Sequence, residues 1–155
     1  VAGCARRIIE SERVPRIFGD ESFVAGMLHD IGKLILAMNQ PEDYERALTL
    51  SHSEGVPLYI AEEQVLGANH ADVGGSILSL WGLPARVVEA ITYHHDPETS
   101  AATGLNPLIA VHVANCAVNL RKSPALDRAI HGPRVEFLTS LGLQENIDQW
   151  MSLEL

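Results

Sequence analysis

An adjacent histidine and aspartate are the first feature of this sequence that could do chemistry. His29-Asp30 sets an imidazole nitrogen beside a carboxylate oxygen, a mixed pair that suits divalent metals such as Fe, Mn and Zn. The dipeptide alone is a weak indication, because the chain contains a second one at His95-Asp96. The placement of the other histidines therefore decides whether His29-Asp30 belongs to a site.

Three further histidines lie on apolar faces at helical spacing. These are His70 beside Val73 and Ile77, His94 beside Val87 and Ile91, and His95 beside Val88. Any one of them taken alone is best explained as a core residue hydrogen-bonded to a carbonyl or carboxylate, since an unpaired buried imidazole carries a desolvation cost. Taken together with the His29-Asp30 pair, they predict imidazoles that converge on a metal site.

The remaining three histidines are predicted to lie outside this site. His52 and His131 have polar neighbours in the sequence, which is typical of surface residues. His112 lies on a predicted buried helix, where a structural role is favoured over a role as ligand.

Glycines flank the candidate residues. Gly32 is predicted to let the chain bend immediately after the His-Asp pair. Gly74-Gly75 is predicted to allow two helices to approach closely, because the segment GANHADVGG lacks the strand and the spacing of a phosphate-binding loop.

The elements that must position these residues are all helical. Apolar residues recur at helical spacing, and sustained alternation with period two is absent. Proline and glycine separate the predicted helices. Four of them span about 2–12, 41–54, 71–81 and 108–120, two more end near 66 and 95, and two shorter ones lie around 137–141 and 147–151. The fold class is therefore all-α, a compact helical bundle.

Three apolar stretches are predicted to face the core. They are the stripe of Phe23, Val24, Met27, Leu28 and Ile31, the short piece from Leu34 to Met38, and the face shared by Val73, Ile77, Leu80 and Trp81.

Length and composition are those of one globular domain. The chain has 155 residues, of which 46% are hydrophobic. It has neither an apolar run of the roughly 18 residues that cross a bilayer nor the apolar stretch of a signal peptide, so we expect a cytoplasmic protein without membrane contact. Cys4 and Cys116 stand far apart and predict no disulfide framework. Because a helical pattern is already under way at Val1, we expect a piece of a longer protein.

The charge argues against nucleic acid as a partner. The formal net charge is −9, and the 11 Lys and Arg residues form no dense cluster beyond Arg6-Arg7 and Arg121-Lys122. A phosphate backbone would be repelled by this surface.

Three segments carry a resemblance to a known family. They are SFVAGMLHDIGKLILAMNQPEDY, EEQVLGANHADVGGSILSLWGLPARVVEAITYHH and NPLIAVHVANCAVNL. Together they closely resemble HDOD domains, relatives of the HD-domain phosphohydrolases and of the HD-GYP cyclic-di-GMP phosphodiesterases. The resemblance covers about residues 1–121 of a single HD-like helical domain spanning 1–155, in which residues 122–155 are predicted to form a C-terminal helical extension.

The resemblance implies a metal motif that is incomplete here. Carried over residue by residue, it falls on His29, Asp30, His70, His94 and His95. The aspartate that closes the site in HD phosphohydrolases corresponds to Asn115, a neutral and weaker ligand. The histidine expected on the first helix has no counterpart in VAGCARRIIE, and the GYP signature is missing from HHDPETSAATGLNPL. Two alternatives follow: one divalent metal (Fe, Mn, Mg or Zn) or none.

Lys33 occupies the lysine position of the family's HDxGK motif. There the resemblance implies a cation near a substrate phosphate. The competing interpretation, which we weight equally, is a solvated charge that complements a helix end.

The function that the resemblance implies is regulatory. HDOD proteins are mostly signalling modules, so we expect a bacterial-type signal-transduction domain that is non-catalytic or weakly catalytic. Its partners would be other signalling domains or proteins, with a homo-oligomer as one form. The alternative is a metal-dependent phosphohydrolase, acting as a phosphatase or nucleotide phosphodiesterase. A third interpretation treats the histidines as a buried hydrogen-bond network without metal.

Overall fold

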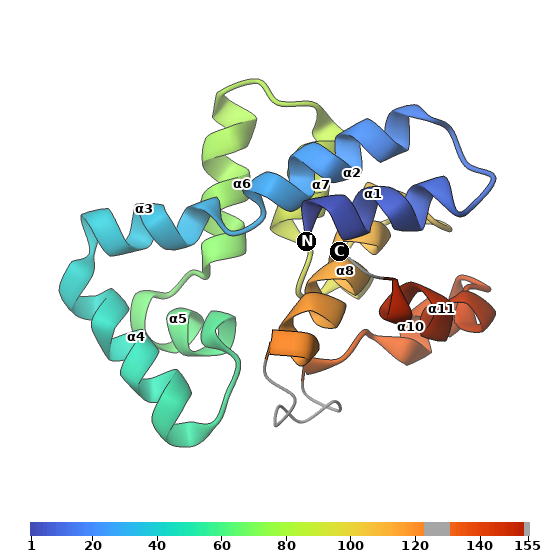
Figure 1. Ribbon diagram of the computed structural model, residues 1–155. Coiled ribbons are helices and arrows are strands. Elements are labelled where there is room, and N and C mark those ends of the chain that lie inside the picture. The colour runs from blue at the N-terminus through green and yellow to red at the C-terminus, as the bar shows by residue number, and fades with distance from the viewer. Residues whose placement is uncertain (123–130, 154–155) are drawn as a thin grey trace.

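The structure, a computed structural model, describes residues 1–122 and 131–153 (Figure 1). Over these ranges it contains helices and no strand, which confirms the predicted all-α class. The helices are α1 (Ala2–Glu10), α2 (Ile17–Leu28), α3 (Ile31–Asn39), α4 (Pro41–Glu54), α5 (Leu58–Leu66), α6 (His70–Leu80), α7 (Ala85–Thr92), α8 (Pro107–Lys122), α10 (Val135–Ser140) and α11 (Ile147–Ser152), with 3₁₀ turns at Pro97–Thr99 and Gln144–Asn146. No helix in the described part of the chain is both long and apolar enough to cross a membrane.

Local signals in the sequence explain where the helices end. Helix α4 begins at Pro41, with Glu42 and Asp43 in its first turn, and ends at Gly55, whose φ of 67° is left-handed. Helix α6 begins with a capping box in which Asn69 accepts from the backbone N–H of Ala71 and Asp72. The predicted boundaries therefore agree with the observed ones to within about one turn.

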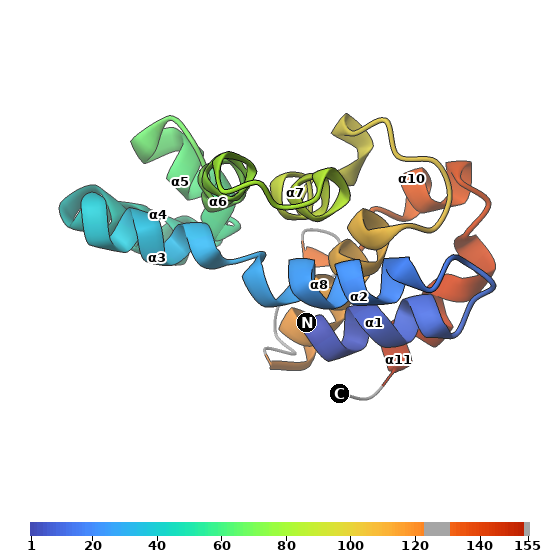
Figure 2. The ribbon, with the colours of Figure 1, turned by 90° about the horizontal axis from the view of Figure 1, so that it is seen from above.

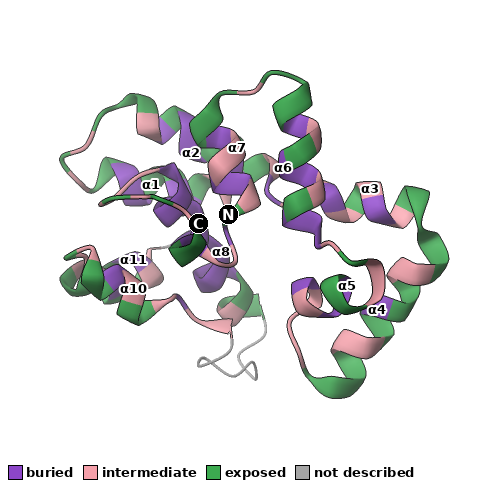
Figure 3. Cartoon of the chain, turned by 180° about the vertical axis from the view of Figure 1, so that it is seen from behind, coloured by how far each residue is buried: buried purple, intermediate pink, exposed green. Residues whose placement is uncertain are grey.

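Helix α8 lies at the centre of the core, where α1, α2, α7 and α11 pack around it (Figures 1 and 2). Every residue of α8 from Pro107 to Val118 is buried, as Figure 3 shows in purple. Trp150 of α11 is also fully buried. Of the extension predicted over 122–155, α11 packs on α8, while residues 123–130 and 154–155 lie outside the described residues.

Helices α3, α4 and α5 extend to one side of this core (Figure 2). Helix α4 packs on α5, and α3 packs on α6. This side arm brings the start of α3 and the start of α6 together beside the core helices.

The predicted apolar stripe from Phe23 to Ile31 is only partly right, because Leu28 and Ile31 pack against the core but its other three members do not. Phe23, Val24 and Met27 are exposed, Met27 by 62%, and the buried face carries small or polar residues such as Ala25 and Gly26. A side chain at Gly26 would come within 2.7 Å of the Cα of Ala2. Close backbone packing of α2 on α1 has replaced packing by large side chains.

The same correction applies to α3 and α6. Leu34 and Met38 are exposed, and only Leu36 among the predicted apolar residues of α3 is buried. Leu80 at the end of α6 and Trp81 directly after it are exposed, while Val73 and Ile77 are partly buried. The buried face of α6 consists instead of His70, Ala71, Gly74, Gly75 and Leu78.

Glycines set the spacing between these helices. The bend after the His-Asp pair lies at Asp30, and Gly32 is already inside α3, so its predicted role is wrong. A Cβ at Gly32 would lie 1.9 Å from the backbone oxygen of His70, and one at Gly75 would lie 2.0 Å from Oγ1 of Thr92. Close approach, predicted for Gly74-Gly75, is thus also what Gly32 provides.

Candidate metal centre

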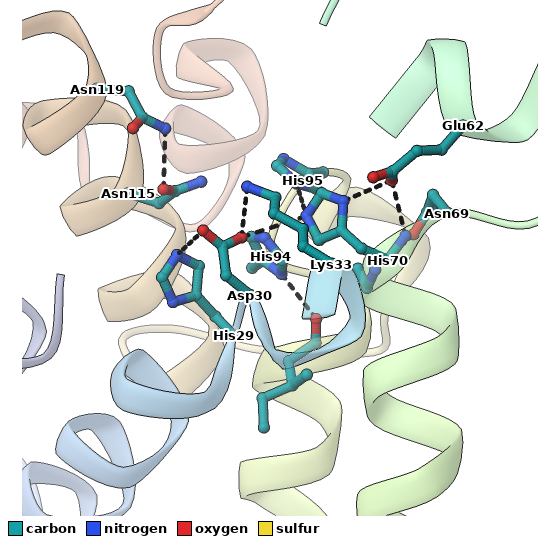
Figure 4. A network of polar contacts seen from close by, with 12 residues as sticks. His29, Asp30, Lys33, Glu62, Asn69, His70, His94, His95, Asn115 and Asn119 are labelled. Atoms are coloured by element: carbon teal, nitrogen blue, oxygen red, sulfur yellow. Dashed lines mark hydrogen bonds and ion pairs between the residues drawn. The ribbon is translucent and has the colours of Figure 1, made fainter. Parts of the chain in front are cut away.

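The structure brings the five predicted ligands together from three junctions in the chain. His29 and Asp30 connect α2 to α3, His70 begins α6, and His94 and His95 follow α7 (Figure 4). Donor atoms of His70, His94 and His95 lie within 4.8 Å of one another, and so do those of His29, Asp30 and His94. Two overlapping donor clusters therefore share His94.

His29 and His94 are oriented by carbonyls of their own helices. The Nδ1–H of His29 donates to the oxygen of Gly26 at 2.9 Å, and that of His94 donates to the oxygen of Ile91 at 2.7 Å. The proton on Nδ1 leaves a lone pair on Nε2 of each ring. Nε2 of His94 is buried and has no hydrogen-bond partner, which is the condition expected of a ligand that faces a cation.

His70 is oriented by a side chain from another helix. Its ring Nδ1 lies 2.5 Å from Oε2 of Glu62. Its Nε2 lies 3.0 Å from Nε2 of His95 and 3.4 Å from Oδ1 of Asp30. Two imidazole lone pairs repel at such a distance, so either a proton or a cation has to lie between His70 and His95.

His95 is held by an aromatic ring and by the residue that follows it. Its ring stacks on that of Tyr59 at 4.2 Å between centroids. The Tyr59 hydroxyl accepts from Nη2 of Arg134 at 3.3 Å, and Arg134 also forms an ion pair with Asp96. The second His-Asp dipeptide thus has a role in the structure, because Asp96 fixes the segment around Arg134.

The electrostatics favour neutral imidazoles at His29, His94 and His95 beside an ionised carboxylate. His70 differs: burial lowers its pKa, but hydrogen bonds to Asp30 and Glu62 outweigh burial and raise it. Burial holds the pKa values of His94 and His95 well below their ordinary range, and neighbouring imidazoles lower them further. Burial opposes ionisation of Asp30, yet its hydrogen bond to His70 and the adjacent His29 and Lys33 keep its pKa well below the usual range. Neutral nitrogens and an anionic oxygen are the forms that bind metal.

A cavity of about 130 Å³ opens over these groups. Its lining includes Lys33, Tyr59, His70, His94, His95, Asn115, Asn119, His131 and Arg134. Asn115 is buried here, and its Oδ1 accepts from Nδ2 of Asn119 at 3.0 Å. His131, predicted as a surface residue, lies in the cavity wall, while His52 is exposed as predicted.

Lys33 lies in the cavity wall and pairs with the candidate ligand Asp30. The distance from its Nζ to Oδ1 of Asp30 is 2.8 Å. Its ammonium therefore lies beside the candidate centre, close to where a divalent cation would sit.

His112 lies outside the donor clusters, as its predicted structural role requires. Its Nδ1–H donates to the oxygen of His94 at 2.8 Å, and its Nε2 accepts from the backbone N–H of Arg134 at 3.0 Å. Both ring nitrogens are thus used to join the turn after α7 to the C-terminal segment.

Glu62 is the residue of this site that the sequence analysis missed. It lies on α5, fully buried, and reaches His70 across a loop. The available signal was its position three residues after Tyr59, on the same face of a helix. In the sequence alone that face resembles any other mixed helix face, because nothing marks Glu62 as more buried than its neighbour Glu63.

The residues present fit a divalent cation. The site offers imidazole nitrogens and one carboxylate oxygen, the donor types that bind Zn, Fe and Mn. The unpartnered Nε2 of His94 and the opposed Nε2 atoms of His70 and His95 are both accounted for by a positive charge among them.

Comparison with known proteins points to one family. A model of the HDOD domain family matches residues 1–97, a shorter range than the 1–121 of the sequence resemblance. An uncharacterised protein of Treponema pallidum (strain Nichols) is 24% identical over 76 residues, which is 49% of this chain and 15% of that protein.

Two crystal structures share the fold. One is an HDOD domain protein of unknown function from Geobacter sulfurreducens, with a TM-score of 0.68 and 22% identity over 98% of this chain and 60% of that one. The other is described as a "putative phosphohydrolase" from Shewanella amazonensis SB2B, with a TM-score of 0.68 and 17% identity over 97% and 58%. The chain therefore spans less than two thirds of each protein that it matches.

Proposed function

The chain belongs to the HDOD domain family, and on that premise we propose that it is a bacterial, cytoplasmic signalling module that binds one divalent cation. It acts through contacts with other domains or proteins, or with a second copy of itself, rather than by turning over a substrate. Its cation ligands are His29, Asp30, His70, His94 and His95.

One observation carries the cation site. Four imidazoles converge with the carboxylate of Asp30, and three of the four have Nδ1 engaged by an acceptor, so that Nε2 is directed at the common centre. Hydrogen bonds that fix the tautomer of a histidine ring are typical of metal ligands.

Two features support a regulatory role over a catalytic one. Asn115 supplies a neutral amide where a phosphohydrolase would have a carboxylate, which removes one negative charge from the site. The cavity of about 130 Å³ is also smaller than the roughly 300 Å³ at which ligand pockets for drug-sized molecules begin.

The test is the metal content of protein purified without chelators. Elemental mass spectrometry should find about one divalent transition metal per chain, and a His29→Ala, Asp30→Ala double variant should lose it. The matched control is His52→Ala, because His52 is exposed and belongs to neither the donor clusters nor the cavity wall. Metal retained in the double variant, or absent from the native protein after incubation with Mn²⁺ or Zn²⁺, would contradict the proposal.

A metal-dependent phosphohydrolase is the second candidate, and Lys33 favours it. Its ammonium lies 2.8 Å from Asp30 in the cavity wall, where it could bind a phosphate oxygen. A divalent cation supplies Lewis-acid activation to such chemistry. In this case His29→Ala and Asp30→Ala should each abolish hydrolysis of a phosphomonoester or phosphodiester without unfolding the protein.

Asn115→Asp separates the two functions. If the domain is regulatory because Asn115 is neutral, this variant should bind Mn²⁺ roughly tenfold more tightly than the native protein. Gln149→Glu, at an exposed position on α11, is the control for added charge. A native protein that already hydrolyses phosphate esters at a rate of about 1 s⁻¹ or more would establish the enzyme and rule out the regulatory proposal.

A further inference from the structure

We infer that Glu62 is a positioning residue that fixes the ring of His70 for cation binding. The inference rests on the proposed cation site and adds to it a carboxylate from α5. That helix carries none of the proposed ligands.

Glu62 makes two hydrogen bonds to the same residue. Its Oε2 accepts from the backbone N–H of His70 at 2.8 Å and from the ring Nδ1–H at 2.5 Å (Figure 4). One oxygen thus fixes both the start of the α6 backbone and the rotation of the ring. The second oxygen, Oε1, is buried and has no hydrogen-bond partner.

The position of His70 in the chain explains why it needs such a partner. His29 and His94 each follow a helix, so a carbonyl three residues earlier lies under the ring. His70 is the first residue of α6, preceded by the loop at 67–69. No helical turn stands before it to supply a carbonyl, and a side chain from α5 takes that place.

Burial of the Glu62 carboxylate destabilises the folded protein unless its negative charge makes a compensating interaction. Its side chain is fully buried, and removing a carboxylate from water costs several kcal/mol that a single histidine partner offsets only in part. An apolar residue of similar size would often leave a protein equally stable or more so. A negative charge on Nδ1–H does, however, make the opposite nitrogen a stronger metal ligand.

The neighbouring residue provides an internal control. Oε1 of Glu63 accepts from Nδ2 of Asn69 at 2.6 Å, so Glu63 also holds the start of α6. It contacts neither His70 nor the cavity. Replacement of Glu63 therefore perturbs the same helix end while leaving the histidine ring untouched.

The first measurement uses metal-free protein. ¹⁵N–¹H spectra of the imidazoles at alkaline pH, assigned with a His70→Asn variant, should show the Nδ1–H tautomer for His70. Glu62→Met, which removes the acceptor at similar volume, should give a mixture with the Nε2–H tautomer. Glu62→Gln keeps an acceptor oxygen and should keep the Nδ1–H form, as should Glu63→Gln.

The second measurement is the affinity for Mn²⁺ by isothermal titration calorimetry. Glu62→Met should weaken binding by about 10- to 100-fold, Glu62→Gln should recover part of that loss, and Glu63→Gln should bind as the native protein does. Thermal unfolding of each variant separates this effect from stability, because a purely structural Glu62 would lower the melting temperature and leave the affinity of the folded protein unchanged.

The outcomes distinguish this inference from the proposed function. Native-like affinity of Glu62→Met, or an Nδ1–H tautomer that survives in it, would overturn the role of Glu62. If the native protein binds no Mn²⁺, the proposed cation site fails. The tautomer of His70 then still decides whether Glu62 sets the orientation of the ring.

Discussion

The two sides of the candidate centre hold their histidines in different ways. His29 and His94 are held by carbonyls of their own helices, three residues earlier in the chain; we call them the carbonyl-held pair. His70 is held by the carboxylate of Glu62, eight residues away on another helix. The carbonyl-held pair keeps its orientation whenever α2 and α7 form, because backbone carbonyls cannot be substituted. The orientation of His70 depends on α5, α6 and the contact between them.

This difference implies that the geometry of the site depends on how the side arm of α3, α4 and α5 packs, more than on the core around α8. Ligands of the carbonyl-held pair belong to helices packed on α8. His70 reaches them only because α6 lies against the start of α3. The largest effects should therefore come from changes at this junction.

We expect the largest effect from Gly32→Ala, at the contact between the start of α3 and the start of α6. The added methyl would meet the backbone oxygen of His70 at 1.9 Å, and a backbone atom cannot rotate aside as a side chain can. We expect a loss of roughly 3 kcal/mol in the free energy of unfolding, measured by urea denaturation. Gly3→Ala on α1 is the control, because nothing lies within 4 Å of its Cβ; it should stabilise by about 0.5 kcal/mol. Equal midpoints for the two variants would show that α3 and α6 do not approach as described.

A second test concerns His112, whose hydrogen bond to the carbonyl of His94 places it on the side of the carbonyl-held pair. Burial lowers its pKa from the ordinary 6.5 to about 4, and Arg134 adds to this, while its bond to the carbonyl of His94 opposes it. The unfolded chain thus takes up a proton near pH 6.5 and the folded protein only near pH 4. Stability should fall as the pH drops between these values, by on the order of 3 kcal/mol from this residue, and level off below them.

The measurement compares urea unfolding of the native protein and His112→Gln from pH 7 to pH 4. The variant should start less stable at pH 7, since it loses hydrogen bonds to the turn after α7, but it should lose less stability as the pH falls. His94 and His95 are present in both proteins, so the difference between the two curves reports His112 together with its bond to the carbonyl of His94. Parallel curves would mean that His112 is not buried as a neutral ring.

The sequence was sufficient for the helices and for the set of histidines and the aspartate that converge in the structure. Pro41, Gly55 and the Asn69 cap are local signals that act through backbone geometry, so they can be read without knowing the fold. Histidines at a helix end, such as His94, are likewise placed by a local carbonyl. The family resemblance named the same residues by a separate route.

What could not be predicted is which face of a helix is buried. Apolar periodicity indicated Met27 and Trp81 as core residues, whereas α2 and α6 bury small residues in close helix contacts. Glu62 escaped prediction for the same reason, because its burial depends on the packing of α5 against α6. Both errors come from tertiary packing, which a periodic pattern does not contain.

We expect the smallest effect from Lys33→Gln. Lys33 pairs with Asp30, which lies between His29 of the carbonyl-held pair and His70. Oδ2 of Asp30 is 3.4 Å from Nε2 of His29, and Oδ1 of Asp30 is 3.4 Å from Nε2 of His70. The ammonium of Lys33 competes with a metal for this carboxylate. Because such partly exposed pairs contribute about 0.2–1 kcal/mol, the variant should bind Mn²⁺ more tightly, by no more than about fivefold. Lys122→Gln, exposed at the end of α8, controls for net charge. Weaker Mn²⁺ binding in Lys33→Gln would mean that the ammonium holds Asp30 in place for the metal, which would make Lys33 a counterpart of Glu62 on the other side of the centre.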